Sequence, residues 1–107
     1  MANESAVLRK VMGSLTLRSM IQKDTLYIRM DKSSIGMPDI IACISGRFFG
    51  IEVKDDANGK YKLTEAQKMR GKAIESAGGV FLVVDKNTVV DLNETIDDWL
   101  RVKGVEQ

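Results

Sequence analysis

The chain has 107 residues, of which 44% are hydrophobic and 29% are charged, and its formal net charge is +1. This composition is ordinary for a globular protein, and we expect residues 1–107 to form one domain. A net charge near zero gives no overall attraction to nucleic acid or membrane, so any basic binding surface must be local. The sequence has no histidine, which excludes histidine-based triads and most zinc sites.

The first predicted element is a helix with Asn3 as its N-cap that ends near Met20 or Gln22, followed by a half-buried or edge strand over residues 25–30. Glu4 lies one turn before Leu8, on the same face of the helix. The helical spacing by itself favours a solvent-exposed acid that stabilises the helix dipole. The apolar face of this helix consists of Leu8, Val11, Met12 and Leu15.

A β-hairpin is predicted next, because two β-prone runs, 40–44 and 47–54, flank the dipeptide Ser45-Gly46. Both runs carry apolar residues on both faces, so we expect a central sheet that is covered on both sides. Cys43 lies within the first run and is predicted to be a buried, small hydrophobic residue. A single cysteine is also consistent with a reducing compartment, and we expect a cytoplasmic protein because no stretch suits a signal peptide or membrane span.

The register of this hairpin decides which polar residues meet. If Ser45 and Gly46 are the central turn residues, Asp39 lies directly opposite Glu52. Lys54 falls on the same face as Glu52, because side chains alternate along a strand. The hairpin would then gather two carboxylates and an amine at one end, unless a bulge breaks the register.

A second helix is predicted from the sequence Thr64-Glu65-Ala66-Gln67, which matches a capping box. Its expected apolar stripe is Ala66, Met69, Ala73, Ile74 and Ala77. A buried strand over residues 80–84 follows, and a right-handed crossover would place it parallel to 47–54. The coarse order is therefore α-β-β-β-α-β plus a C-terminal helix, an α/β fold with a mixed central sheet flanked by helices.

Two carboxylates beside a lysine suit divalent-metal chemistry on a phosphate ester. Mg²⁺ prefers oxygen ligands and is usually bound by one or two carboxylates, which Asp39 and Glu52 can supply, and the Val53 carbonyl can add a third oxygen. Lys54 could hold or deprotonate the attacking water, or stabilise the transition state. The alternative is a balanced charge cluster at a solvent-exposed hairpin end, because Glu-x-Lys often occurs on strands by chance.

Other polar residues around the hairpin have weaker signals. For Gln67 the capping-box role is a sufficient explanation. Basic and polar residues in the flanking loops and helix could bind phosphate, although lysine clusters are more often a solvated face. The nucleic-acid-binding candidates are Lys32, Ser34, Lys62 and Lys68.

Taken together, three features resemble the PD-(D/E)xK nuclease superfamily and, within it, the small stand-alone VRR-NUC domains often encoded by bacteriophages. They are Gly36-Met37-Pro38-Asp39, Glu52-Val53-Lys54, and a helix that opens with Thr64 and Gln67. The resemblance extends from about residue 4 to residue 84. It implies a restriction-endonuclease-like core and phosphodiester cleavage that depends on Mg²⁺ or Mn²⁺.

The resemblance also implies roles for individual residues. Asp39 and Glu52 correspond to metal ligands, Lys54 to the catalytic lysine, Glu4 to the acid of the first helix that joins the metal site, and Gln67 to the polar active-site residue after the Glu-x-Lys strand. Small VRR-NUC domains resemble homodimeric nucleases that cut branched DNA such as four-way junctions. A phage-encoded member would act in the host cytoplasm.

Two alternatives from other functional classes stay open at this point. A nucleic-acid-binding adaptor with the same fold would bind DNA without cutting it, and its binding would fall steeply with salt. A structural or inhibitory phage protein would bind no DNA. If the protein is a homodimer, its candidate interfaces are the strand with Leu26 and Tyr27 and the helix with Trp99.

Overall fold

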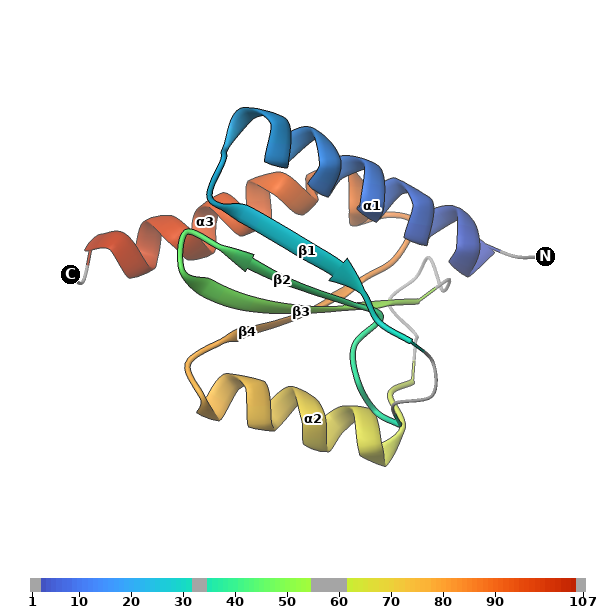
Figure 1. The fold of residues 1–107 in the computed structure, drawn as a ribbon. Coiled ribbons are helices and arrows are strands. Elements are labelled where there is room, and N and C mark those ends of the chain that lie inside the picture. The colour runs from blue at the N-terminus through green and yellow to red at the C-terminus, as the bar shows by residue number, and fades with distance from the viewer. Residues whose placement is uncertain (1–2, 32–34, 55–61, 106–107) are drawn as a thin grey trace.

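A computed structural model describes residues 3–31, 35–54 and 62–105, with the backbone alone for residues 3–5 and 102–105. The fold is mixed α/β, with a four-stranded sheet between helices (Figure 1). The predicted element order is confirmed, with a short 3-10 helix added before the last helix. The elements are α1 (Asn3–Ile21), β1 (Thr25–Arg29), β2 (Ile40–Ile44), β3 (Arg47–Val53), α2 (Glu65–Ser76), β4 (Val80–Val84), η1 (Val89–Asp91) and α3 (Leu92–Val105).

The sheet has the strand order β1-β2-β3-β4, in which β1, β2 and β3 are antiparallel neighbours and β4 is parallel to β3. Ser45 and Gly46 both have positive φ, 51° and 80°, as a two-residue turn of type I′ requires. Ile40 pairs with Ile51 across the hairpin, so Asp39, one residue before β2, lies opposite Glu52. The predicted hairpin register is confirmed.

Helices α1 and α3 cover one face of the sheet (Figure 1). Arg18 of α1 ties the two helices together, donating to the Asn93 side-chain oxygen at 3.2 Å and to the Asp97 carboxylate at 2.5 Å. The core lies between these helices and the sheet, where apolar side chains from both are buried away from water. Its fully buried large residues include Val11, Leu15, Ile40, Ile44, Phe49, Ile51, Val53 and Ile96.

Helix α2 covers the opposite face, over β3 and β4 (Figure 1). The predicted apolar stripe of this helix is confirmed only at Ala66 and Ile74, which are half-buried. Met69 is 71% exposed, Ala73 and Ala77 are also exposed, and Gly71 is the buried residue of the helix. A side chain at Gly71 would begin 2.7 Å from the Phe81 ring on β4, so its absence lets the helix backbone pack against the strand. This packing turns the face that carries Gln67, one turn before Gly71, toward the sheet.

On the α2 side of the sheet, α2 does not cover β1 and β2. Leu26 of β1 is 64% exposed and Ile28 is 51% exposed, and both lie beside Cys43 and Phe48 on the same side of the sheet. Cys43 is exposed, so its predicted burial is wrong. The expectation of a sheet covered on both sides holds for β3 and β4, while the described residues leave β1 and β2 open on this side.

In the part of the chain that the structure describes, no helix has both the length and the apolar character to cross a membrane.

Candidate active site

The two predicted carboxylates meet at the end of the hairpin that lies away from its turn. One Asp39 side-chain oxygen accepts a hydrogen bond from the backbone N–H of Val53 at 2.7 Å, which fixes the carboxylate between β2 and β3. The Asp39 carbonyl accepts from the N–H of Met30, so β1 holds the same residue from the other side. Glu52 is buried on β3, with its side chain 5% exposed.

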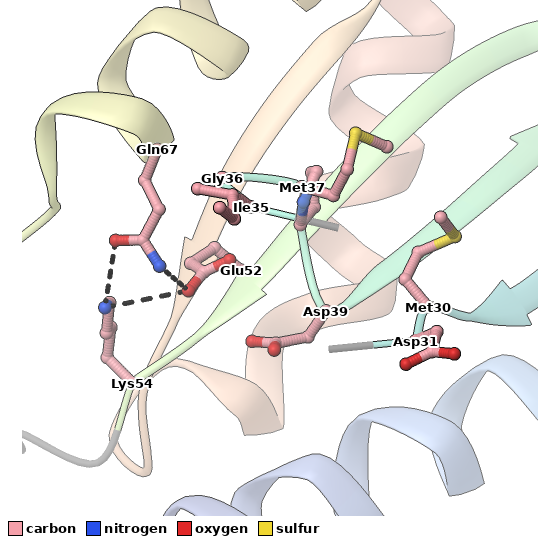
Figure 2. Close-up of a pocket in the computed structure, with 10 residues that line it drawn as sticks. Met30, Asp31, Ile35, Gly36, Met37, Asp39, Glu52, Lys54 and Gln67 are labelled. Atoms are coloured by element: carbon pink, nitrogen blue, oxygen red, sulfur yellow. Dashed lines mark hydrogen bonds and ion pairs between the residues drawn. The ribbon is translucent and has the colours of Figure 1, made fainter. Parts of the chain in front are cut away.

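Lys54 and Gln67 complete a polar network around Glu52 (Figure 2). The Lys54 ammonium lies 3.6 Å from the Glu52 carboxylate and donates to the side-chain oxygen of Gln67 at 3.2 Å. The Gln67 amide nitrogen donates to the same Glu52 oxygen at 2.7 Å. Burial of a carboxylate is costly unless it is paired, and here the ammonium and the amide supply that pairing.

Two glycines explain why the loop before β2 delivers Asp39 to this place. Gly36 has a φ of 80°, and a Cβ there would lie 2.7 Å from the Ala66 carbonyl oxygen in the first turn of α2. A Cβ at Gly50 would lie 2.9 Å from the ring of Pro38. The loop therefore packs closely on α2 and on β3, and Pro38 restrains the backbone directly before Asp39.

The network faces a pocket with a volume of about 290 Å³. Asp39, Glu52, Lys54 and Gln67 all line it, so hairpin and helix α2 contribute to one surface (Figure 2). The remaining lining comes from the segment between β1 and β2, namely Met30, Asp31, Ile35, Gly36, Met37 and Pro38. The alternative of a charge cluster at a solvent-exposed hairpin end is disfavoured, because the carboxylate at its centre is buried.

The donor set suits a hard divalent cation. In an extended strand the N–H and C=O of one residue point to the same side, so we expect the Val53 carbonyl on the side of β3 that faces β2, where the Val53 N–H meets Asp39. Asp39, Glu52 and this carbonyl can thus present three oxygens, a type of ligand that Mg²⁺ and Mn²⁺ prefer. Among the described side chains, no three carboxylates, cysteines or histidines gather as a metal-binding cluster.

The other predicted site residues fall into two groups. Glu4 lies in the first turn of α1, but its side chain is outside the described part of the chain, and Lys32 and Ser34 lie outside the described residues altogether. Lys62 and Lys68 are exposed, and Lys68 pairs with Glu65 at 3.4 Å. Neither contributes to the pocket wall, so their binding of nucleic acid stays a prediction.

Sequence reasoning missed part of the site. Asp31 and Ile35 line the pocket, although neither belongs to a motif. The signal that could have found them is position, since both lie in the loop that leads from β1 to Asp39. The sequence also predicted the capping role of Gln67, while its contact with Glu52 and Lys54 depends on the rotation of α2.

Comparison with solved structures identifies the fold. One, described as a VRR_NUC domain, superposes with a TM-score of 0.68 and 22% sequence identity, covering 88% of this chain and 97% of its own. A second, a VRR_NUC domain protein, gives a TM-score of 0.66 at 21% identity, covering 94% and 90%. This chain has the VRR_NUC fold. The predicted resemblance is thus confirmed at the level of fold. The structural alignments cover nearly the whole of this chain and of both solved structures.

By sequence alone, no family model and no curated protein matches the chain. The VRR_NUC fold is therefore assigned from the similarity of backbone structure. The roles proposed for the site residues rest on the geometry described above.

Proposed function

We propose that this protein is a divalent-metal-dependent endodeoxyribonuclease that hydrolyses phosphodiester bonds. The observation that carries the proposal is the convergence of Asp39, Glu52 and Lys54 on one pocket, with Glu52 buried and the amine 3.6 Å from it. The VRR_NUC fold supports it, because the two similar structures carry a nuclease-domain name. A protein that only binds DNA has no need for buried carboxylates beside the phosphate, which they repel.

Asp39, Glu52 and the Val53 carbonyl are the residues that would hold Mg²⁺ or Mn²⁺, with Glu4 as a further candidate ligand. When bound, such an ion would neutralise charge on the phosphate and lower the pKa of a coordinated water. Asp39 is prepared for this role, because its bond to the Val53 N–H fixes the carboxylate before any ion arrives. Preorganised ligands lose less entropy on binding.

Lys54 contributes a positive charge next to the carboxylates. Its side chain is 17% exposed, which leaves the ammonium accessible from the pocket. It can hold the attacking water or stabilise the charge that develops on the phosphate, and either role needs the amine at a fixed place. Gln67 provides that fixed place through its hydrogen bond to the amine.

The proposal extends to branched DNA, such as a four-way junction, and to a homodimer that would present two sites related by two-fold symmetry. Of the two candidate interfaces, the open sheet face with Leu26 and Ile28 is the better supported, because it exposes two large apolar side chains. Trp99 is 41% exposed but already stacks with Arg47, whose guanidinium carbon lies 5.6 Å from the ring centre.

The decisive test is incubation with labelled four-way junction, flap, duplex and single-stranded DNA, with and without Mg²⁺ or Mn²⁺. We expect metal-dependent cleavage of branched DNA, with cutting lost in Lys54→Ala and junction binding retained. Lys23→Ala is the matched control, because Lys23 is an exposed lysine at the other end of the hairpin. Salt-sensitive junction binding without cleavage in any metal would instead identify an adaptor.

The homodimer is tested separately by light scattering on the eluted protein. A mass of twice 11.9 kDa is expected for the wild type, and Leu26→Lys should shift the protein toward the monomer. A wild-type monomer at micromolar concentration would refute the homodimer and leave the nuclease assignment to the cleavage assay.

A further inference from the structure

Gln67 joins the first turn of α2 to the proposed active site through both ends of its amide. The side-chain oxygen accepts from the backbone N–H of Thr64 at 2.9 Å and from the Lys54 ammonium at 3.2 Å. The side-chain nitrogen donates to the Glu52 carboxylate at 2.7 Å. The backbone N–H of Gln67 donates to the Thr64 hydroxyl at 3.0 Å.

These partners permit only one orientation of the amide. An ammonium and a backbone N–H can only donate, so they require the amide oxygen, while an ionised carboxylate can only accept and requires the amide nitrogen. A flipped amide would place like groups against each other at all three contacts. The same capping box that starts α2 therefore orients the group that holds Glu52 and Lys54.

We propose that Thr64 is a positioning residue of the active site, acting through Gln67; this inference rests on the proposed nuclease function. Thr64 is exposed and lies outside the pocket wall, so its effect on Lys54 must pass through the helix cap. Without its hydroxyl, the Gln67 N–H loses its acceptor in the protein, and the first turn of α2 loosens. Lys54 and Glu52 would then lose a fixed hydrogen-bond partner.

The first experiment compares Thr64→Ala with Thr64→Ser in the cleavage assay. The Thr64 backbone is extended, with φ −69° and ψ 164°, and serine retains the capping oxygen. We expect Thr64→Ala to lower kcat about tenfold with KM for DNA within about twofold, because misplacement of catalytic groups reduces the rate of the chemical step. Thr64→Ser should restore kcat.

Ala73→Gly is the matched control for a general loss of helix stability. Ala73 is exposed in the second half of α2, and glycine there weakens the helix without removing the cap. It should lower the melting temperature to a similar extent and leave kcat unchanged. The proposal is overturned if Ala73→Gly and Thr64→Ala reduce kcat equally, or if Thr64→Ser does not restore it.

Gln67→Glu separates the cap from the bridge. Glutamate also serves at this position of a capping box, so the helix should keep its cap, but a carboxylate cannot donate to Glu52. We expect kcat to fall at least as far as in Thr64→Ala while the melting temperature changes less. Unchanged kcat in Gln67→Glu would show that the bridge is dispensable and would overturn the proposal.

A readout without DNA keeps the two proposals apart. In NMR spectra, the Gln67 side-chain amide protons should exchange slowly with water and have shifts far from those of an exposed glutamine in the wild type and in Thr64→Ser. In Thr64→Ala they should exchange faster, with shifts closer to those of an exposed glutamine. An unchanged Gln67 signal in Thr64→Ala would refute the positioning role. A wild type that cuts no DNA would refute the nuclease function, while this comparison would still decide whether Thr64 orients Gln67.

Discussion

The β2–β3 hairpin has a carboxylate network at each of its two ends. At the turn, Asp24 accepts a hydrogen bond from the Ser45 hydroxyl at 2.8 Å, and the Gln22 amide donates to that hydroxyl at 2.7 Å. At the opposite end, Glu52 accepts from Gln67 and lies beside Lys54. Each network combines a carboxylate with an amide side chain, yet the first is exposed and the second surrounds a pocket.

The difference between these ends is the environment of the carboxylate. Asp24 lies in water, and its hydrogen bond with Ser45 holds its pKa below the usual range, so it stabilises a turn at little cost. Glu52 is removed from water, where a charge requires partners of opposite charge. A hydrogen-bonded acid is thus no sign of function by itself, while a buried acid that faces a pocket suits a cation.

The largest expected effect comes from removing the carboxylate charge of Asp39, and the same change at Asp24 is its control. Asp39→Asn keeps an oxygen for the Val53 N–H but loses the negative charge, so we expect cleavage to fall by about 10²–10³-fold, on the scale of a lost electrostatic group. Asp24→Asn likewise keeps an acceptor for Ser45 and should retain full activity. Single-turnover cleavage rates measure both. Equal losses would refute the assignment of chemistry to the Asp39 end.

The next effect concerns the metal and needs no substrate. An ion present at 100 times its Kd adds ~2.7 kcal/mol to stability. Mn²⁺ should therefore raise the melting temperature of the wild type by roughly 10 °C, and chelation with EDTA should reverse the shift. Asp24→Asn should respond as the wild type does, while Asp39→Asn should respond weakly. If Mn²⁺ does not change the melting temperature of the wild type, the proposed metal site is contradicted.

Alanine substitutions at two glycines, one at each end of the hairpin, compare how tightly the two ends are packed. Gly36 beside the site and Gly46 in the turn share a φ of 80°, but only Gly36 has close neighbours, with Ala66 within 2.7 Å of a Cβ position. Alanine at either place costs ~1–2 kcal/mol of backbone strain, and Gly36→Ala adds ~1–3 kcal/mol of overpacking. Urea unfolding should therefore give a larger loss for Gly36→Ala. Equal losses would mean that the loop moves away freely.

The smallest expected effect is at the turn. Ser45→Ala removes the hydrogen bond that lowers the pKa of Asp24, so this pKa should rise toward its usual value, as NMR titration of the Asp24 carboxyl would measure. A lowered pKa in the folded state stabilises the protein above the unfolded-state pKa and loses that effect as the pH falls through the folded-state pKa. Ser45→Ala should therefore be less stable than the wild type above the pKa of Asp24. This difference should disappear in strong acid, where Asp24 is protonated in both proteins. Cleavage should stay unchanged.

Much of the site follows from local sequence. The two-residue turn at Ser45-Gly46 fixes the register of the hairpin, and the register places Asp39 opposite Glu52 and Lys54 on the same face as Glu52. The capping box fixes the start of α2 one residue after Thr64. These predictions succeed because each depends on residues close together in the chain, whose geometry has few alternatives.

The errors arise where contacts between distant elements decide. Met69 is apolar and at helical spacing, but α2 rotates it to the surface because Gly71 packs on Phe81. Cys43 lies in an apolar strand, but α2 packs over β3 and β4 and leaves this side of β2 open. Propensity and periodicity describe one element at a time, so they cannot say which neighbour covers it.

The sequence by itself determined the element order, the hairpin register and the pairing of Asp39 with Glu52, because turn geometry and strand periodicity act over a few residues. Only the tertiary structure decided that Gln67 reaches Glu52 and Lys54, that Asp31 and Ile35 line the pocket, and that the second sheet face stays partly open. These outcomes depend on the close packing of α2 and of residues 35–38 in the core of the fold, which glycines at three separate places in the chain allow: Gly36, Gly50 and Gly71.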